Sequence, residues 1–137
     1  LLEHYQAGRL DDAEKLATFI SQEFPKHQFA WKFLGAVLEV KGKKSEAVKA
    51  NQTAVALSPQ DAEAHSSLGN TLKELGRLDE ALASYNQAII LKNNFGKAQL
   101  GLGLVLMLMG QHKEGLRQIR LGNGAIIFDI DNWAVIQ

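Results

Sequence analysis

Residues that can ligate a metal or move a proton are scattered along this chain rather than grouped. The four histidines, His4, His27, His65 and His112, show neither an HExxH pattern nor a paired spacing that would place two imidazoles on one helix face. The sequence has no cysteine, which removes thiolate ligands, cysteine nucleophiles and disulfides. We therefore expect no metal site and no cofactor.

Two other groups resemble functional motifs only superficially. Acidic pairs such as Asp11-Asp12 stand in the first turn of an expected helix, where negative charge favours the helix dipole. Gly101-x-Gly103 has the glycine spacing of a dinucleotide loop, but it falls within an expected helix and no strand precedes it. No nucleophile has a base and an orienting group beside it in a recognisable pattern. The sequence predicts no enzyme.

Composition narrows the class of partner. The chain has 137 residues, about one domain, with 15 basic and 15 acidic residues that are interspersed. Nucleic-acid binding needs a basic stripe, so we expect no nucleic-acid partner. The longest apolar run, residues 104–109, is too short to span a bilayer, and we expect no membrane partner. The sequence starts at Leu1, partway through a repeat and without a signal-peptide pattern, so we interpret it as a fragment of a cytoplasmic protein.

The elements that must position any functional residue follow a period of 34 residues. Glycines stand at one place in every period, and a small residue follows each glycine five positions later. A Leu-Gly pair recurs on the same period. Such self-similarity predicts a stack of like supersecondary units. The glycines are Gly8, Gly42, Gly76 and Gly110; the small residues are Ala13, Ala47, Ala81 and Gly115; the pairs are Leu34-Gly35, Leu68-Gly69 and Leu102-Gly103.

Each unit reads as a helix, a tight glycine turn and a second helix. Apolar residues recur at helical spacing on both sides of each glycine. Glycine suits the left-handed position just after a helix, and Pro25 and Pro59 mark breaks between units. The predicted helices span residues 1–7, 10–23, 28–41, 44–57, 62–75, 78–91, 96–109 and 112–121.

The pattern resembles the tetratricopeptide repeat. Unit 28–61 matches best, with large and small residues at the family's places: Trp31, Leu34, Gly35, Gly42, Ala47, Ala54 and Pro59. The resemblance covers about residues 1–121 and implies an all-α, right-handed solenoid of antiparallel helix hairpins. The units are 1–27 (partial), 28–61, 62–95 and 96–124, which together form an array over 1–124.

The resemblance also implies a binding surface. In this family the first helices of the hairpins line a concave face, which usually holds an extended peptide. We therefore predict a non-catalytic scaffold for protein–protein interaction that binds a peptide or helix of a partner. The predicted contact residues are Phe29, Lys32, Phe33, Ala36, Ser66, Asn70, Lys73, Leu100 and Leu104.

Two specialisations of the family are not supported by the residues present. The carboxylate clamp needs spaced Lys, Asn and Arg, but its places hold Leu2, Phe33, Glu63 and Ser67. The asparagine ladder has Phe33, Ser67 and Gly101 at its places. The partner chemistry is therefore left open.

The C-terminal part departs from the pattern. Gly115 and Gly122 replace the usual alanines of the fourth unit, and helical glycine costs roughly 0.5–1 kcal/mol relative to alanine, so we expect this hairpin to be the weakest. Helix 96–109 is apolar on all sides, which predicts burial. β-Branched and aromatic residues at 125–130 and 133–136 predict two short strands, and we expect residues 125–137 to fold back as a β-structured cap.

Two other functions are compatible with the same residues. Arrays of this type are often fused to glycosyltransferases and oxygenases, so the chain could recruit substrates for a larger enzyme. The apolar fourth repeat and the tail could instead form a homodimer through residues 96–137.

Overall fold

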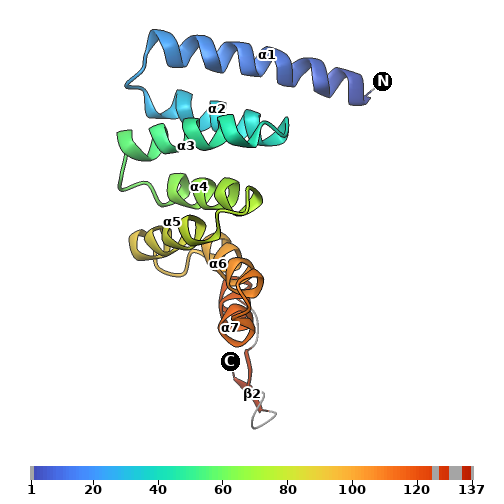
Figure 1. Ribbon diagram of the computed structural model, residues 1–137, viewed down its shortest axis with the longest axis vertical. Coiled ribbons are helices and arrows are strands. Elements are labelled where there is room, and N and C mark those ends of the chain that lie inside the picture. The colour runs from blue at the N-terminus through green and yellow to red at the C-terminus, as the bar shows by residue number, and fades with distance from the viewer. Residues whose placement is uncertain (1, 125–126, 130–133, 137) are drawn as a thin grey trace.

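The computed structural model describes residues 2–124, 127–129 and 134–136, and over these residues the chain forms seven α-helices and two short strands. Figure 1 shows the helices stacked in chain order along the long axis of the molecule. From α2 onward every helix agrees with its predicted bounds to within one residue. The helices are α1 (Leu2–Glu23), α2 (Gln28–Val40), α3 (Lys44–Leu57), α4 (Ala62–Glu74), α5 (Leu78–Leu91), α6 (Gly96–Leu108) and α7 (His112–Gly122).

The same glycine turn closes each of the three complete hairpins. Gly42, Gly76 and Gly110 have φ of 79°, 78° and 85°, the left-handed conformation that a Cβ disfavours. The residue after each glycine donates its N–H to a carbonyl five positions back, as Lys43 does to Leu38 over 2.9 Å. This cap satisfies carbonyls that the helix end leaves open, and it fixes the direction in which the second helix returns.

The first glycine of the period does not form a turn. Gly8 lies inside α1, which runs unbroken from Leu2 to Glu23, so the predicted helices 1–7 and 10–23 are one helix. In the three complete hairpins the glycine turn joins two helices that pack side by side. Residues 2–7 make less than two helical turns, and continuing the helix adds backbone hydrogen bonds at the modest cost of one helical glycine.

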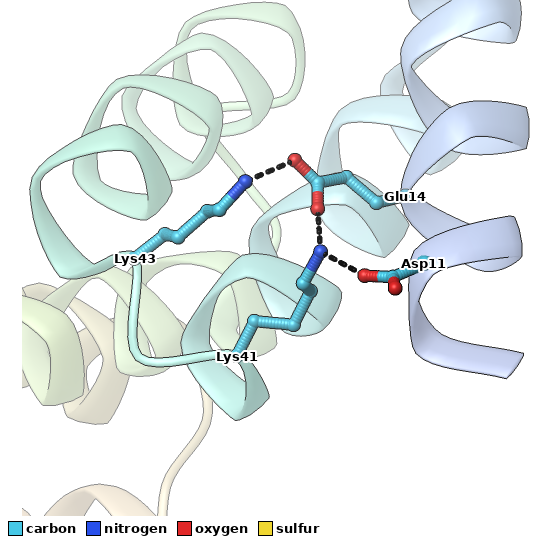
Figure 2. Close-up of polar contacts among 4 residues, drawn as sticks. All are labelled: Asp11, Glu14, Lys41 and Lys43. Carbon is cyan, nitrogen blue, oxygen red and sulfur yellow. Dashed lines mark hydrogen bonds and ion pairs between the residues drawn. The ribbon is translucent and has the colours of Figure 1, made fainter. Parts of the chain in front are cut away.

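Charged side chains hold α1 against the turn between α2 and α3. Lys41 donates to Asp11 over 2.6 Å and also to Glu14, whose other carboxylate oxygen accepts from Lys43 over 2.9 Å. Figure 2 shows the two lysines reaching across from the turn to both carboxylates. The Lys41 hydrogen bond lowers the pKa of Glu14 and that of Asp11.

Large side chains fill the space between hairpins where glycines admit them. Tyr85 is fully buried on α5, and a Cβ at Gly69 of α4 or at Gly101 of α6 would lie 2.9 or 2.3 Å from its ring. The Tyr85 hydroxyl donates to the side-chain oxygen of Asn70. Burial, with the charges of Glu74 and Glu39, raises the pKa of this phenol. The ring thereby ties the third unit to the fourth.

The glycines of the fourth unit have a packing role that the sequence did not reveal. A Cβ at Gly103 of α6 would lie 2.6 Å from the Gly115 carbonyl oxygen of α7, and one at Gly122 would lie 2.8 Å from the Gly96 carbonyl oxygen. The two helix backbones therefore approach more closely than alanines would permit. These glycines lower the helix propensity of α6 and α7, but they also allow the closer packing of the two helices.

The expected C-terminal cap is not supported. Two three-residue strands, β1 (Ile127–Asp129) and β2 (Ala134–Ile136), pair antiparallel with Phe128 opposite Val135. In Figure 1 β2 lies past α7 at the end of the stack, not over α6. Within α6 the repeat packing buries Leu102, Val105 and Leu106, but Leu104 and Leu108 are exposed, so the expected burial of this helix on all sides is wrong. Residues 125–126, 130–133 and 137, which the predicted tail includes, lie outside the described residues.

Candidate functional site

Three depressions follow one face of the array, the face made by the first helices α2, α4 and α6. Their lining residues stand at matching places of the repeat: Ala36 and Leu104 are two periods apart, as are Val40 and Leu108. The depressions therefore lie along one face rather than at unrelated points of the surface. We refer to them as the N-terminal groove, the central pocket and the C-terminal pocket.

The N-terminal groove lies between α1 and α2 and is apolar. It has a volume of about 450 Å³ and is lined by Arg9, Leu10, Ala13, Phe33, Val37 and Val40. Val40 is 70% exposed. Beside the groove, the rings of Phe29 and Phe33 stack with their centroids 6.2 Å apart. This end of the face thus presents aromatic and branched apolar side chains to solvent.

The central pocket is polar and has a hydrogen-bonded floor. Its volume is about 350 Å³, and its wall includes Glu39 and Asn51. The Asn51 amide donates to Glu39 over 2.9 Å and to the Thr71 hydroxyl over 3.0 Å, and that hydroxyl donates to Glu39. Gly35 gives Asn51 its place, because a Cβ there would lie 2.1 Å from the Asn51 amide oxygen. These bonds link α2, α3 and α4 beneath the pocket.

The rim of the central pocket is tied down by Asp61, the N-cap of α4. Its carboxylate accepts from the Ala64 N–H over 3.2 Å, from Gln28 over 2.7 Å and from Lys32 over 2.8 Å. Burial alone would raise the pKa of Asp61, but the hydrogen bonds from Lys32, Gln28 and Ala64 outweigh it and lower that pKa to about 2. Across the rim Lys97 faces Glu63 at 3.9 Å. Both lysines of the central pocket are thus paired with carboxylates, while the Glu39 carboxylate accepts from the neutral Asn51 and Thr71 side chains.

The C-terminal pocket is apolar again. It has a volume of about 380 Å³ between α4, α6 and the start of α7, and Leu104 and Leu108 in its wall are 46% and 65% exposed. Lys73 and His112 stand at its edge, and Met107 completes the lining. A bulky apolar side chain of a ligand would find an apolar surface here with a cation beside it.

The structure brings most of the predicted contact residues onto this face, with one correction. Ser66 is only 3% exposed and is not part of the surface, whereas Lys32 and Leu100, one period before and after it, are half-buried. Asn70 is exposed, but it also accepts the Tyr85 hydroxyl. The sequence indicates Asp61 as the N-cap of helix 62–75, which the structure confirms, but it does not reveal the bonds of Asp61 to α2 or those that join Glu39, Asn51 and Thr71, because these contacts form between helices.

The described residues include neither a group that could bind a metal nor a helix that could span a membrane. In that part of the chain no three His, Cys, Asp or Glu side chains are grouped in a way that could hold a metal ion. None of the helices found there is both long enough and apolar enough to cross a bilayer.

Comparison with known families identifies the repeat. The family model described as TPR repeat matches residues 40–76 and 69–110, and the two matches together cover just over half of the chain. The chain belongs to the TPR-repeat family. In a comparison with curated proteins, no sequence matched significantly.

Solved structures show the same fold. "MamA MSR-1 C2" is 26% identical with a TM-score of 0.75, over 88% of this chain and 70% of that one. "MamA AMB-1 P212121" is 25% identical with a TM-score of 0.75, over 97% and 70%. "MamA 41-end from Desulfovibrio magneticus RS-1" is 22% identical with a TM-score of 0.79, over 88% and 68%. This TPR-repeat chain is therefore a helical-repeat scaffold of the kind that mediates protein–protein interaction.

Proposed function

We propose that this TPR-repeat chain is a non-catalytic scaffold that binds a peptide or helix of a partner protein along the face of α2, α4 and α6. The observation that carries the proposal is the order of the three depressions, apolar at both ends and polar between. Soluble proteins leave few large apolar side chains grouped and exposed without a use for them. Phe29 and Val40 at one end, and Leu104 and Leu108 at the other, are such residues.

The polar centre supports an extended ligand. A peptide that crosses it meets donors and acceptors, while its apolar side chains enter the depressions on either side. Lys32 and Lys97 are already paired with Asp61 and Glu63, so the centre has little net charge to attract polyanions. This agrees with a protein partner and not with a nucleic acid.

The test is selection of peptides from a displayed random library on the wild-type protein. Selected peptides should bind the double variant Leu104→Glu, Leu108→Glu about tenfold or more weakly, because two carboxylates would have to be desolvated in the C-terminal pocket. Both side chains are exposed, so the fold should survive the change. Fluorescence anisotropy measures the affinities.

The matched control is Ile90→Glu. Ile90 is 72% exposed but lies on the second helix α5, away from the proposed face. Selected peptides should bind this variant as they bind wild type. Peptides that lost affinity for Ile90→Glu but not for the double variant would place the binding surface on the other side of the array.

One observation favours a second function, self-association through the last hairpin. Leu116 and Leu121 of α7 are exposed as well as Leu104 and Leu108. A homodimer that used residues 96–137 would cover them. Light scattering across a concentration range tests this function. Self-association is supported if the mass of wild type rises from that of a monomer to that of a dimer, while Leu116→Glu keeps the mass of a monomer.

A further inference from the structure

The central pocket corresponds to a space that a tyrosine fills in the next unit. Asn51 of α3 lies against Gly35 of α2, and one period later Tyr85 of α5 lies against Gly69 of α4. The Tyr85 ring also reaches α6, where a Cβ at Gly101 would lie 2.3 Å from it. Asparagine is much smaller than tyrosine, so the second unit keeps an open space where the third unit is filled.

The residues around this space follow the same correspondence. Ser67 of α4 stands one period before Gly101, and Ala36 of α2 stands one period before Asn70, which accepts the Tyr85 hydroxyl. Both Ser67 and Ala36 line the central pocket. Its walls come mainly from two complete hairpins, α2 with α3 and α4 with α5, so its opening does not depend on where the chain begins or ends.

Two oxygen atoms in the pocket wall have no hydrogen-bond donor. One carboxylate oxygen of Glu39 accepts from Asn51 and Thr71, and among the described residues none donates to the other oxygen. In the same part of the chain no group donates to the side-chain oxygen of Asn51, although this side chain is only 3% exposed. Both oxygens face open space, because no fully buried side-chain nitrogen or oxygen atom of the described residues lacks a partner. The central pocket is the open space that Glu39 and Asn51 share.

The Glu39 carboxylate is also the one charge of the pocket that no described residue neutralises. Its hydrogen-bond donors are neutral side chains. At the rim, Lys32 is paired with Asp61 over 2.8 Å. Lys97 faces Glu63 at 3.9 Å, and the Lys97 side chain is 76% exposed. Three carboxylates thus stand against two ammonium groups, and the pocket with its rim keeps one negative charge.

Open acceptors and a negative charge together favour a cationic donor as the ligand group. An ammonium group has three N–H donors and a guanidinium group has five, and neither has an acceptor that would oppose these oxygens. Hydrogen bonds that involve a charged group are about twice as strong as those between neutral groups. The pocket volume of about 350 Å³ leaves room for the long stem of either side chain.

We propose that the central pocket binds a lysine or arginine side chain of the peptide that lies along the face of α2, α4 and α6. This inference rests on the proposed peptide-binding function and adds the chemistry of one ligand residue. The cationic group donates to Glu39 and Asn51, while apolar side chains near it in the peptide enter the C-terminal pocket. A partner segment is therefore recognised by a basic residue with apolar residues close to it.

The test compares two protein variants with the peptides selected on wild type. Glu39→Gln removes the charge but keeps an oxygen that accepts from Asn51 and Thr71, so the fold should survive. Selected peptides should bind it about tenfold or more weakly, because hydrogen bonds to a charged group are lost. Fluorescence anisotropy measures the affinities, and thermal melting checks the fold.

The matched control is Glu46→Gln. Glu46 is exposed on α3 and does not line any of the three depressions, so the variant removes the same charge from a different surface. Selected peptides should bind it within about twofold of wild type. A general attraction between an acidic protein surface and a basic peptide would weaken binding to both variants alike.

Changes in the peptide identify the group that enters the pocket. Lysine or arginine should recur at one position of the selected peptides. Replacing this residue with norleucine, which is of similar length but uncharged, should weaken binding to wild type about tenfold and hardly change binding to Glu39→Gln. The NMR signals of the Asn51 side-chain amide should shift when the basic peptide binds, and they should shift less with the norleucine peptide.

Three results would overturn the inference. They are selected peptides without a recurrent lysine or arginine, equal affinity for wild type and Glu39→Gln, or equal weakening by Glu39→Gln and Glu46→Gln. If such peptides still lose affinity for the double variant of Leu104 and Leu108, the peptide-binding function stands and only the pocket for a basic residue fails. If no peptide is selected on wild type, both proposals fail.

Discussion

At the scale of single residues, Tyr85 and the glycines around it decide how two units meet. Gly101→Ala would bring a Cβ to within 2.3 Å of the Tyr85 ring, a rigid group that is fully buried and cannot swing away. Alanine gains up to about 1 kcal/mol of helix propensity, but overpacking a core costs about 1–3 kcal/mol. We expect a net loss of stability, measured as a lower midpoint in urea unfolding.

The matched substitution is Gly8→Ala. Gly8 also lies within a helix, but it has no left-handed φ, and a Cβ there would meet nothing within 4 Å. With no clash to oppose it, the propensity term should raise stability by roughly 0.5–1 kcal/mol. If both substitutions shifted the urea midpoint in the same direction, the requirement for glycine at position 101 would not come from close packing around Tyr85.

Residue identity alone does not reveal which side chain can replace another. His65 stands where Trp31 stands one period earlier, and each uses a ring nitrogen to bond the carbonyl oxygen of the proline six residues before it, both over 2.9 Å. The period predicts that the two share a place, but not the shared bond. Ser66 shows the reverse case, since its place in the repeat predicts exposure but its side chain is buried.

At the scale of helices, Asp61 joins α4 to α2, and this contact should make stability depend on pH. The pKa of Asp61 is about 2 in the folded chain against an ordinary 3.8, so the stabilisation is present above 3.8 and is lost as pH falls through about 2. A difference of this size is worth at most roughly 2.4 kcal/mol. Its side chain is 21% exposed, which reduces that figure further.

Asp61→Asn isolates this effect, because asparagine caps a helix about as well as aspartate but has no charge to pair with Lys32. Wild type should be more stable than the variant at pH 6, and the gap in the free energy of unfolding should close between pH 4 and pH 2. Urea titrations at each pH measure it. A gap that stayed constant down to pH 2 would mean that the Asp61 carboxylate is not stabilised by its partners.

The bounds of a helix could be predicted well where the same helix–turn–helix arrangement recurs on either side of it. From α2 to α7 the turn glycines and the helical spacing of apolar residues recur, and the predicted bounds agree to within one residue. Gly8 fits the period equally well but has no packed helix before it, so the period failed there. The ion pairs of Lys41 with Asp11 and Glu14 could not be foreseen, because Lys41 has no counterpart at Leu75 or Met109 one and two periods later.

At the scale of the whole molecule, the helices form a chain of neighbours rather than one shared core. One buried cluster joins Ala17 to α2 and α3 through Leu34 and Leu38. The other runs from Val48 through Tyr85 to Leu106 and spans α3 to α6. Arrays built this way have stability that is close to a sum of unit and interface terms. The proposed binding face is rigid only as far as these interfaces hold.

This architecture predicts that damage at the first interface stays local. Ala17→Asp puts a charge into a fully buried position between α1 and α2, so amides of residues 10–23 should exchange rapidly while those of α4 to α6 stay protected. Leu72→Ala, at a position 2% exposed in the second cluster, should cost about 2–5 kcal/mol and lower protection throughout α4 to α6. Hydrogen exchange of both variants makes the comparison. Equal loss of protection in α1 and in α4 to α6 after Ala17→Asp would show that the array unfolds as a single unit.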